Sequence, residues 1–304
     1  MAPCEDYRAI ALTRGDPFMK RILTLSTGFL AFALALTGQG DATTLAAAPL
    51  ADVLRTVYFS AVDAKGAQVT DLTAADLSVK EGGKDRPIAD VRPATSPMQV
   101  SILVDDAGTG GFQTSVAQFL QATFGHGHFA IRVLNPQAIK VADFTADFDT
   151  LKAALGRLGP RGRIPNDGEQ IVEGITEAAK ELQQRGAVRP SIVVLTVGGE
   201  KPSSELADEA LNALKSSAAS LNVVYLTGVQ LGKVLGDGPK QSGGMIERVN
   251  GLLGPALAKT ADTLMHQYVL TYNIPDGVKL NEKLSLSTTR KGVTLLAPSR
   301  LRDK

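Results

Sequence analysis

The sequence of 304 residues has one cysteine, three histidines and no run rich in lysine or arginine. Cys4 precedes a targeting segment, so we expect the mature protein to have neither a disulfide bond nor a thiol nucleophile. The 32 Lys and Arg residues nearly balance 31 Asp and Glu residues, giving a net charge of +1. A nucleic-acid binder normally has a basic patch or stripe, so we expect no nucleic-acid partner.

The composition is that of a folded protein. Hydrophobic residues make up 44% of the chain, which also contains 30 glycines. This length and composition predict one or two globular domains, and they argue against a disordered, collagen-like or coiled-coil chain.

The N-terminal region has the plan of a secretory signal peptide. Lys20 and Arg21 precede an apolar run from Ile22 to Leu36, and small or polar residues follow from 37 to 42. We expect residues 19–42 to be the signal and residues 1–18 to be a start-site extension upstream of Met19. The protein is then exported, periplasmic or extracellular, with no membrane span after cleavage, and an uncleaved anchor is the alternative.

Short strands and turns predict a small β part at residues 52–95. Its signals are partial alternation from Arg55 to Val62, a strand from Leu77 to Lys80, a Glu81 to Lys84 turn and a strand from Ile88 to Val91. Pro93 and Pro97 then mark a boundary.

Strands and helices alternate over residues 97–273. The expected strands are 100–104, 129–134, 139–144, 191–196 and 221–227, and the expected helices are 112–124, 148–158, 169–184, 206–214 and 245–264. This alternation predicts an α/β domain with a doubly wound, mostly parallel sheet covered by helices on both faces.

The C-terminal part returns to strands. Gln267 to Tyr272 predicts a strand, and the strands Leu284 to Ser287 and Val293 to Leu296 predict a hairpin around residues 289–292. A lone hairpin needs a partner for its apolar face. We therefore expect residues 275–300 to complete a β-sandwich with residues 52–95, with the α/β domain inserted between them.

The first strand of the α/β domain ends in Asp105-Asp106-Ala107-Gly108-Thr109. Ligands of open parallel sheets bind beyond the carboxyl ends of the strands, so this loop is the first candidate site. A purely structural interpretation is that Asp105 and Asp106 cap the following helix, and that Glu169 does the same for the helix at 169–184.

The segment Leu103 to Thr109 resembles the first metal loop of von Willebrand factor A domains. The segments Val69 to Leu77, Glu81 to Lys84, Ser242-Gly243-Gly244 and Gln267 to Tyr272 occur in matching order. Over about residues 53–300 the chain resembles the secreted bacterial von Willebrand factor A-related proteins, many of them from Acidobacteria. The resemblance implies a von Willebrand factor A-like, Rossmann-like fold.

The family's metal-ion-dependent adhesion site (MIDAS) holds a divalent cation with an Asp and two hydroxyls of the first loop, a Thr of a second loop and the Asp of a Thr-Asp-Gly third loop. By this resemblance Asp105 keeps the first carboxylate, and Thr109 can replace one hydroxyl. Ala107 cannot ligate, Glu169 stands where the Thr should be, and Val197 stands where the third-loop Asp should be. We expect a degenerate MIDAS with no cofactor, and Mg²⁺ is the alternative to test.

The resemblance implies a non-enzymatic, adhesion-type module that binds a protein partner, with no catalytic residues. The expected partner-binding edge contains Asp105, Asp106, Thr109 and Glu169. One alternative is an adhesion module dependent on Mg²⁺ or Mn²⁺. Another is an enzyme with a dinucleotide or hydrolytic site at the same sheet edge, although Gln113 interrupts the glycine fingerprint that begins at Gly108.

We predict that the mature N-terminus lies between about Gly38 and Ala48, where a signal peptidase meets small residues. N-terminal sequencing of the protein from its native host measures this. Intact Met1 on protein recovered from the cytosol would contradict export.

Overall fold

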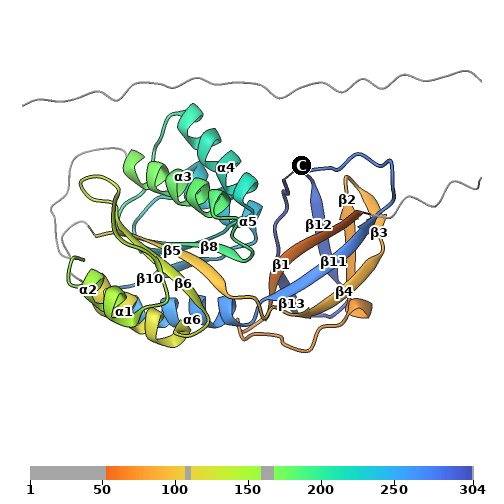
Figure 1. The fold of residues 1–304 in the computed structure, drawn as a ribbon, viewed down its shortest axis with the longest axis horizontal. Helices are drawn as coiled ribbons and strands as arrows, with labels where there is room; N and C mark the ends of the chain where they lie inside the picture. The colour runs from red at the N-terminus through yellow and green to blue at the C-terminus, as the bar shows by residue number, and fades with distance from the viewer. Residues whose placement is uncertain (1–52, 107–110, 159–167, 303–304) are drawn as a thin grey trace, which may run out of the picture. The chain divides into compact units, whose positions relative to one another are not determined.

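The computed structural model describes residues 53–106, 111–158 and 168–302. The signal segment, Ala107 and Thr109 therefore lie outside the described residues. Within these ranges the chain forms an α/β part and a part made of antiparallel strands, which we call the β module (Figure 1).

The α/β part is built on a six-stranded sheet with strand order β10-β9-β8-β5-β6-β7. The strands are β5 (Met98–Asp105), β6 (Gly127–Val133), β7 (Ile139–Thr145), β8 (Pro190–Thr196), β9 (Ser220–Leu226) and β10 (Ile246–Val249). All neighbours are parallel except β7, which runs antiparallel to β6 at one edge. The expected doubly wound, mostly parallel sheet is confirmed.

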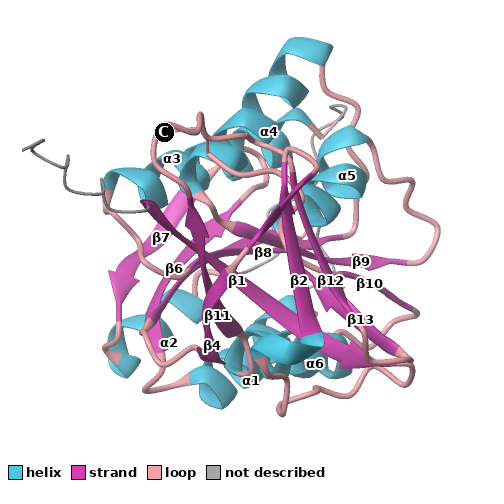
Figure 2. Ribbon diagram, turned by 90° about the vertical axis from the view of Figure 1, so that its right-hand side faces the viewer, coloured by secondary structure: helices cyan, strands magenta, loops and turns pink. Residues whose placement is uncertain are grey.

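Helices cover both faces of this sheet (Figures 1 and 2). They are α1 (Phe112–Thr123), α2 (Phe148–Leu155), α3 (Glu169–Gln184), α4 (Ser204–Ser217), α5 (Lys233–Ser242) and α6 (Gly254–Met265). Helices α1, α2 and α6 share a core with Val100, Ile102 and Val104, whereas α3, α4 and α5 pack with Leu103 on the other face. Alternate residues of β5 thus serve two cores, as expected of a strand buried on both faces. None of the described helices is long and apolar enough to span a bilayer.

Two sequence-based expectations in this part are wrong. Residues 245–264 are not one helical stretch, because Ile246–Val249 forms strand β10 before α6 begins. Helix α5 was not predicted. Its interior contains Gly236, Gly238 and Pro239, residues that normally disfavour a helix, yet Val234 and Leu235 are fully buried and hold it on the sheet.

The β module combines both ends of the described chain in two antiparallel sheets. One sheet has the order β13-β1-β11-β4 and the other has the order β12-β2-β3. The strands are β1 (Val53–Asp63), β2 (Leu77–Glu81), β3 (Lys84–Arg86), β4 (Ile88–Pro93), β11 (Tyr268–Ile274), β12 (Leu284–Thr288) and β13 (Val293–Leu296). One core that includes Phe59, Val79 and Tyr272 draws on both sheets. Strands from both ends of the described chain therefore form one shared core.

The C-terminal strands differ from the expected hairpin. Strand β12 pairs with β2, whereas β13 pairs with β1 in the other sheet, so the turn at residues 289–292 joins two sheets. Strand β11 lies between β1 and β4 in the β module. By strand pairing the α/β part therefore ends with α6 at Met265 rather than at residue 273.

Arg189 joins the two chain segments that connect the α/β part to the β module. Its side chain is buried just before β8. The guanidinium donates to the carbonyl oxygens of Ala94 and Ser96 on one connection, and to Leu264 O and Gln267 Oε1 on the other. Burial lowers the pKa of Arg189 to about 10, so the group stays charged at neutral pH.

The β module contains a second buried charge, the carboxylate of Glu81. The Glu81 carboxylate is 1% exposed and accepts hydrogen bonds from Tyr272 Oη at 2.7 Å and the Asn281 backbone N–H at 2.7 Å. Arg55 Nη1 lies 3.1 Å from Glu81 Oε2. Burial alone would raise the pKa of Glu81, but these hydrogen bonds and the Arg55 charge outweigh it and lower the pKa below its ordinary 4.5.

We predict that Glu81→Gln lowers the free energy of unfolding by about 2 to 4 kcal/mol, because Arg55 loses its buried partner and Tyr272 loses an ionised acceptor. The lowered pKa means that this stabilisation is present above about pH 4.5 and is lost as the pH falls through the folded-state value. Urea unfolding between pH 3 and 7 measures both effects. The exposed Asp85→Asn on the same hairpin should change little, and equal loss in both variants would contradict the buried role.

Candidate functional site

The candidate site lies at the carboxyl edge of the six-stranded sheet. Strands β5, β6 and β8 are parallel neighbours, so Asp105, Asn135 and Thr196 at or just beyond their ends meet at one edge. All three side chains are buried, with 3%, 2% and 0% exposure. Asp105 therefore lies buried at the carboxyl edge of the sheet.

The Asp105 carboxylate is hydrogen-bonded within the protein. Asn135 Nδ2 donates to Asp105 Oδ1, and the Thr196 hydroxyl lies 2.5 Å from Asp105 Oδ2. Asn135 also accepts from Gln170 Nε2 at 3.5 Å. A side-chain network thus links the ends of three strands to the first turn of α3.

Asn135 and Gln170 were not recognised as site residues from the sequence. The available signal for Asn135 was its place directly after the apolar run 129–134, at the same edge as Asp105. Gln170 had no comparable signal, because its neighbour Glu169 occupies the position that the family resemblance picks out. Gln170 is 7% exposed, and its Oε1 has no hydrogen-bond partner among the described residues.

Val197 and Gly198 follow Thr196 in a tight turn. The Gly198 N–H donates to Thr196 Oγ1 at 2.9 Å, and the Val197 N–H donates to Asp105 O at 3.4 Å. The half-buried Val197 side chain packs against the core shared by α1, α2 and α6. The residue that the resemblance matches to a third-loop aspartate is therefore a hydrophobic side chain packed on the core.

The acidic candidates divide into buried and exposed groups. Asp106 is only 5% exposed, so Asp105 and Asp106 are both buried at this edge. Glu169 is exposed in the first turn of α3, where a negative charge stabilises the helix. Helix α1 has Gly111 at its N-cap position, and the Asp105 side chain that was expected to cap this helix accepts hydrogen bonds from Asn135 and Thr196.

A further buried carboxylate, Glu200, lies in the loop after β8. It is 1% exposed, and its Oε1 accepts from the Leu235 N–H at 2.9 Å in the first turn of α5. Burial raises the pKa of Glu200, and the backbone hydrogen bonds from Leu235 and Val234 only partly oppose this effect. Glu200 was not recognised from the sequence, because it belongs to no motif and α5 was not predicted.

Close backbone packing holds these loops together. Gly168 precedes α3 with a φ of +75°, and a Cβ there would overlap the carbonyl oxygen of Gly199. The same substitution at Gly232 would overlap the Glu200 carboxylate. The loop after β8 is therefore packed between the starts of α3 and α5.

One large apolar side chain is exposed at this edge. Leu252 follows β10, whose carboxyl end lies at the same edge because β10 is parallel to β9, and it is 81% exposed. Together with the exposed Glu169, it provides an apolar and an acidic contact point. Among the described residues no group of three or more His, Cys, Asp or Glu side chains could hold a metal ion.

The chain matches no family model and no curated protein sequence. Among solved structures it is similar to a von Willebrand factor type A protein from Catenulispora acidiphila, with 12% identity, a TM-score of 0.47, and coverage of 75% of this chain and 73% of that one. BatB from Bacteroides thetaiotaomicron has 14% identity and a TM-score of 0.42, with 56% and 98% covered. Proximal thread matrix protein 1 from the mussel byssus, with a zinc-occupied MIDAS motif, has 12% identity and a TM-score of 0.43, with 61% and 49% covered.

We predict that Asp105→Asn lowers the free energy of unfolding by about 1 to 3 kcal/mol, because the neutral amide loses the hydrogen bonds that Asn135 and Thr196 donate to an ionised acceptor. Chemical unfolding measures the loss, and the exposed Asp237→Asn on α5 is the matched control. A double-mutant cycle with Thr196→Val isolates the pair. Additive losses in that cycle would show that Thr196 and Asp105 do not stabilise each other.

Proposed function

We propose that the protein is an exported, non-enzymatic module of the von Willebrand factor A type, and that it binds a protein partner at the carboxyl edge of its sheet without a divalent cation. The observation that carries this proposal is the occupied Asp105 carboxylate. Asn135 and Thr196 side chains donate to its two oxygens, so each oxygen already has a hydrogen-bond partner within the protein.

The described donors of this edge do not suit Mg²⁺. A small hard cation needs near-octahedral oxygen ligands at about 2.0 to 2.1 Å. Asp105 supplies the only carboxylate among the matched positions at the ends of β5 and β8, while Val197 contributes no side-chain oxygen and packs into the core. Glu169 is exposed on α3 and already stabilises the start of that helix.

The serines considered for a hydrolytic site have structural partners. Ser191 is buried at the start of β8, where its hydroxyl accepts from Ser220 Oγ and Asn222 Nδ2 at 3.0 Å each. Ser242 Oγ donates to Gly238 O at 2.7 Å and accepts from the Leu221 N–H at 2.9 Å. Ser191 lies at the start of β8 and Ser242 at the end of α5, and both are away from the Asp105 edge. Their structural hydrogen bonds support a binding role for the protein rather than a hydrolytic one.

The exposed residues of the edge define the proposed contact surface. Leu252 offers an apolar side chain and Glu169 an acidic one, while the buried Asp105 and Asp106 support the loops beneath. Thr109 follows β5 in the sequence and lies outside the described residues. We propose that the two exposed side chains, Leu252 and Glu169, are contact points for the partner.

We predict no rise in melting temperature with millimolar Mg²⁺ or Mn²⁺, and no heat of binding with nucleotides. The combined Ala107→Ser, Glu169→Thr and Val197→Asp substitutions add oxygen donors at the positions that the resemblance matches, so they should create Mg²⁺ binding if these loops converge on Asp105. A ligand at a hundredfold excess over its Kd stabilises the native state by about 2.7 kcal/mol, which a thermal melt detects. A metal-dependent rise in the unmodified protein would favour the metal-dependent adhesion module instead.

The partner surface is tested by crosslinking the purified protein to envelope proteins of its native host. Leu252→Asp should lose a partner that the unmodified protein captures, because a charge replaces the apolar contact. Val278→Asp, on a half-exposed loop of the β module, is the matched control and should retain it. Equal capture by both variants would place the partner elsewhere.

A further inference from the structure

A cavity of about 520 Å³ lies at the opposite, amino edge of the six-stranded sheet. One wall is the outer face of the β1, β11 and β4 sheet, where Thr56, Tyr58, Val269 and Thr271 alternate with residues that face the module's own core. The α/β part contributes the turn before β8 and the ends of α3 and α4, and the C-terminal residues 298–302 complete the lining. The volume is within the range of small-molecule sites.

The charges around this cavity have one sign. Arg92, Arg189, Lys215, Arg300 and Arg302 line it, and no Asp or Glu does so among the described residues. The whole chain is nearly neutral, with a net charge of +1. The cavity therefore concentrates positive charge that the composition does not predict.

Acidic residues just outside the lining form ion pairs with some of these cations. Glu282 lies 2.8 Å from Lys215 and 3.7 Å from Arg300, and Asp90 lies 3.1 Å from Arg92. These pairs are at least partly exposed, so solvent screens them. The helix α4, which ends at Ser217, adds only a partial negative charge of about half a unit.

Two cations remain without an acidic partner among the described residues. Arg189 is 5% exposed, and its hydrogen-bond partners among the described residues are neutral carbonyl and amide oxygens. Arg302 is exposed at the cavity rim, where its backbone carbonyl accepts from Arg55 Nη2. A bound anion would balance these charges.

Apolar side chains make up the rest of the lining. Val269 and Leu214 are buried there, Leu211 is partly buried, and Val188 is 60% exposed at the rim. Apolar walls with a few convergent polar groups are typical of ligand pockets. The lining therefore matches a molecule with one charged end and an apolar body.

We propose that this cavity binds a small organic anion with an apolar body, with its acidic group among the arginines and its body against Val269, Leu211 and Val188. Carboxylates and phosphate esters share this chemistry. The site is distinct from the carboxyl edge, since the parallel strands begin at one and end at the other.

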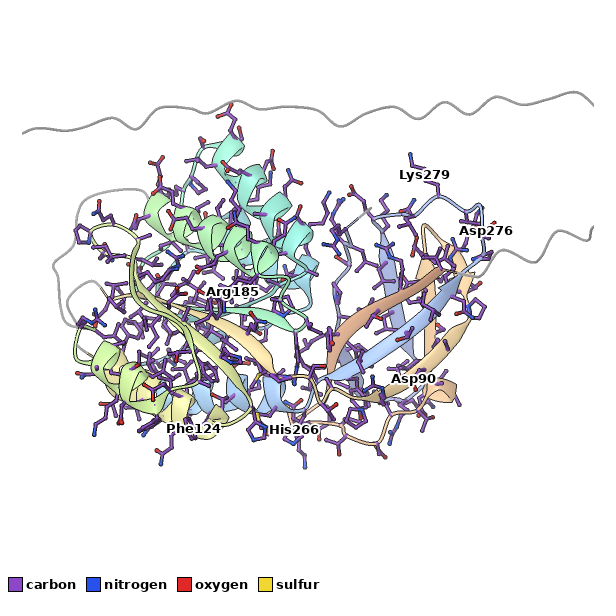
Figure 3. The ribbon with its side chains drawn as sticks, in the orientation of Figure 1. Asp90, Phe124, Arg185, His266, Asp276 and Lys279 are labelled. Carbon is purple, nitrogen blue, oxygen red and sulfur yellow. The ribbon has the colours of Figure 1, made fainter. Side chains whose placement is uncertain are left out.

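The test uses the fluorescent aryl sulfonate 8-anilinonaphthalene-1-sulfonate as probe on the purified protein. We expect saturable binding, and a weaker response from the neutral analogue N-phenyl-1-naphthylamine. The double variant Arg92→Gln with Arg302→Gln should weaken sulfonate binding by about tenfold, because two screened charges are removed. The double variant Lys84→Gln with Lys279→Gln removes the same charge outside the lining and should bind normally; Lys279 projects from a loop of the β module (Figure 3).

Filling the cavity separates binding inside it from binding to a charged surface. Ala187→Trp, from a half-buried lining residue, and Val188→Trp, from the exposed rim, keep every charge and should abolish saturable binding while circular dichroism stays unchanged. Competition by octanoate and by octyl phosphate distinguishes carboxylate from phosphate ligands. Equal binding by both charge variants, or undiminished binding by the folded tryptophan variants, would overturn the proposal.

Discussion

The arrangement of the α/β part on the β module depends on one buried cation, Arg189. The chain crosses between the two parts twice, once on each side of the α/β insertion, and Arg189 donates hydrogen bonds to both crossings. A guanidinium suits this position because its several N–H groups are fixed in one plane and can reach separate acceptors at once. Lysine would carry the same charge without that geometry. Burial of the charge among carbonyl oxygens makes the contact sensitive to any shift of either crossing, since displaced acceptors would leave an unsatisfied buried donor.

At the carboxyl edge a buried carboxylate joins the ends of neighbouring strands. Asp105 remains at the end of β5, and its oxygens accept from Asn135 and Thr196, so the carboxylate helps hold three parallel strand ends in register. The loops that follow these strands therefore start from fixed positions. Leu252 and Glu169 are exposed at the surface of the same edge. A partner contact proposed at this edge needs such rigid support, because ordering mobile loops on binding costs conformational entropy.

The sequence predicted those features that depend on local pattern. Buried strands such as 191–196 read as continuous apolar runs, and the amphipathic helix at 169–184 was placed with the bounds that α3 has. Pairing across the chain was not predictable in the same way. Strands β12 and β13 are close in sequence and look like a hairpin, but β12 pairs with β2 in one sheet and β13 pairs with β1 in the other. At the site, Asp105 was found through its motif, whereas Asn135, Gln170 and Glu200 act through contacts that only the fold creates.

The two proposed sites lie at opposite ends of strand β8, which begins just after Arg189 and ends at Thr196. Its seven residues are all buried, and it pairs with β5 on one side and β9 on the other. A shift of such a strand by one residue would turn every side chain to the opposite face of the sheet, so the strand has no second register. Coupling between distant sites requires an element with two alternative arrangements that both ligands bias. Strand β8 does not provide one, so occupation of the arginine-lined cavity and binding at the carboxyl edge should be energetically independent.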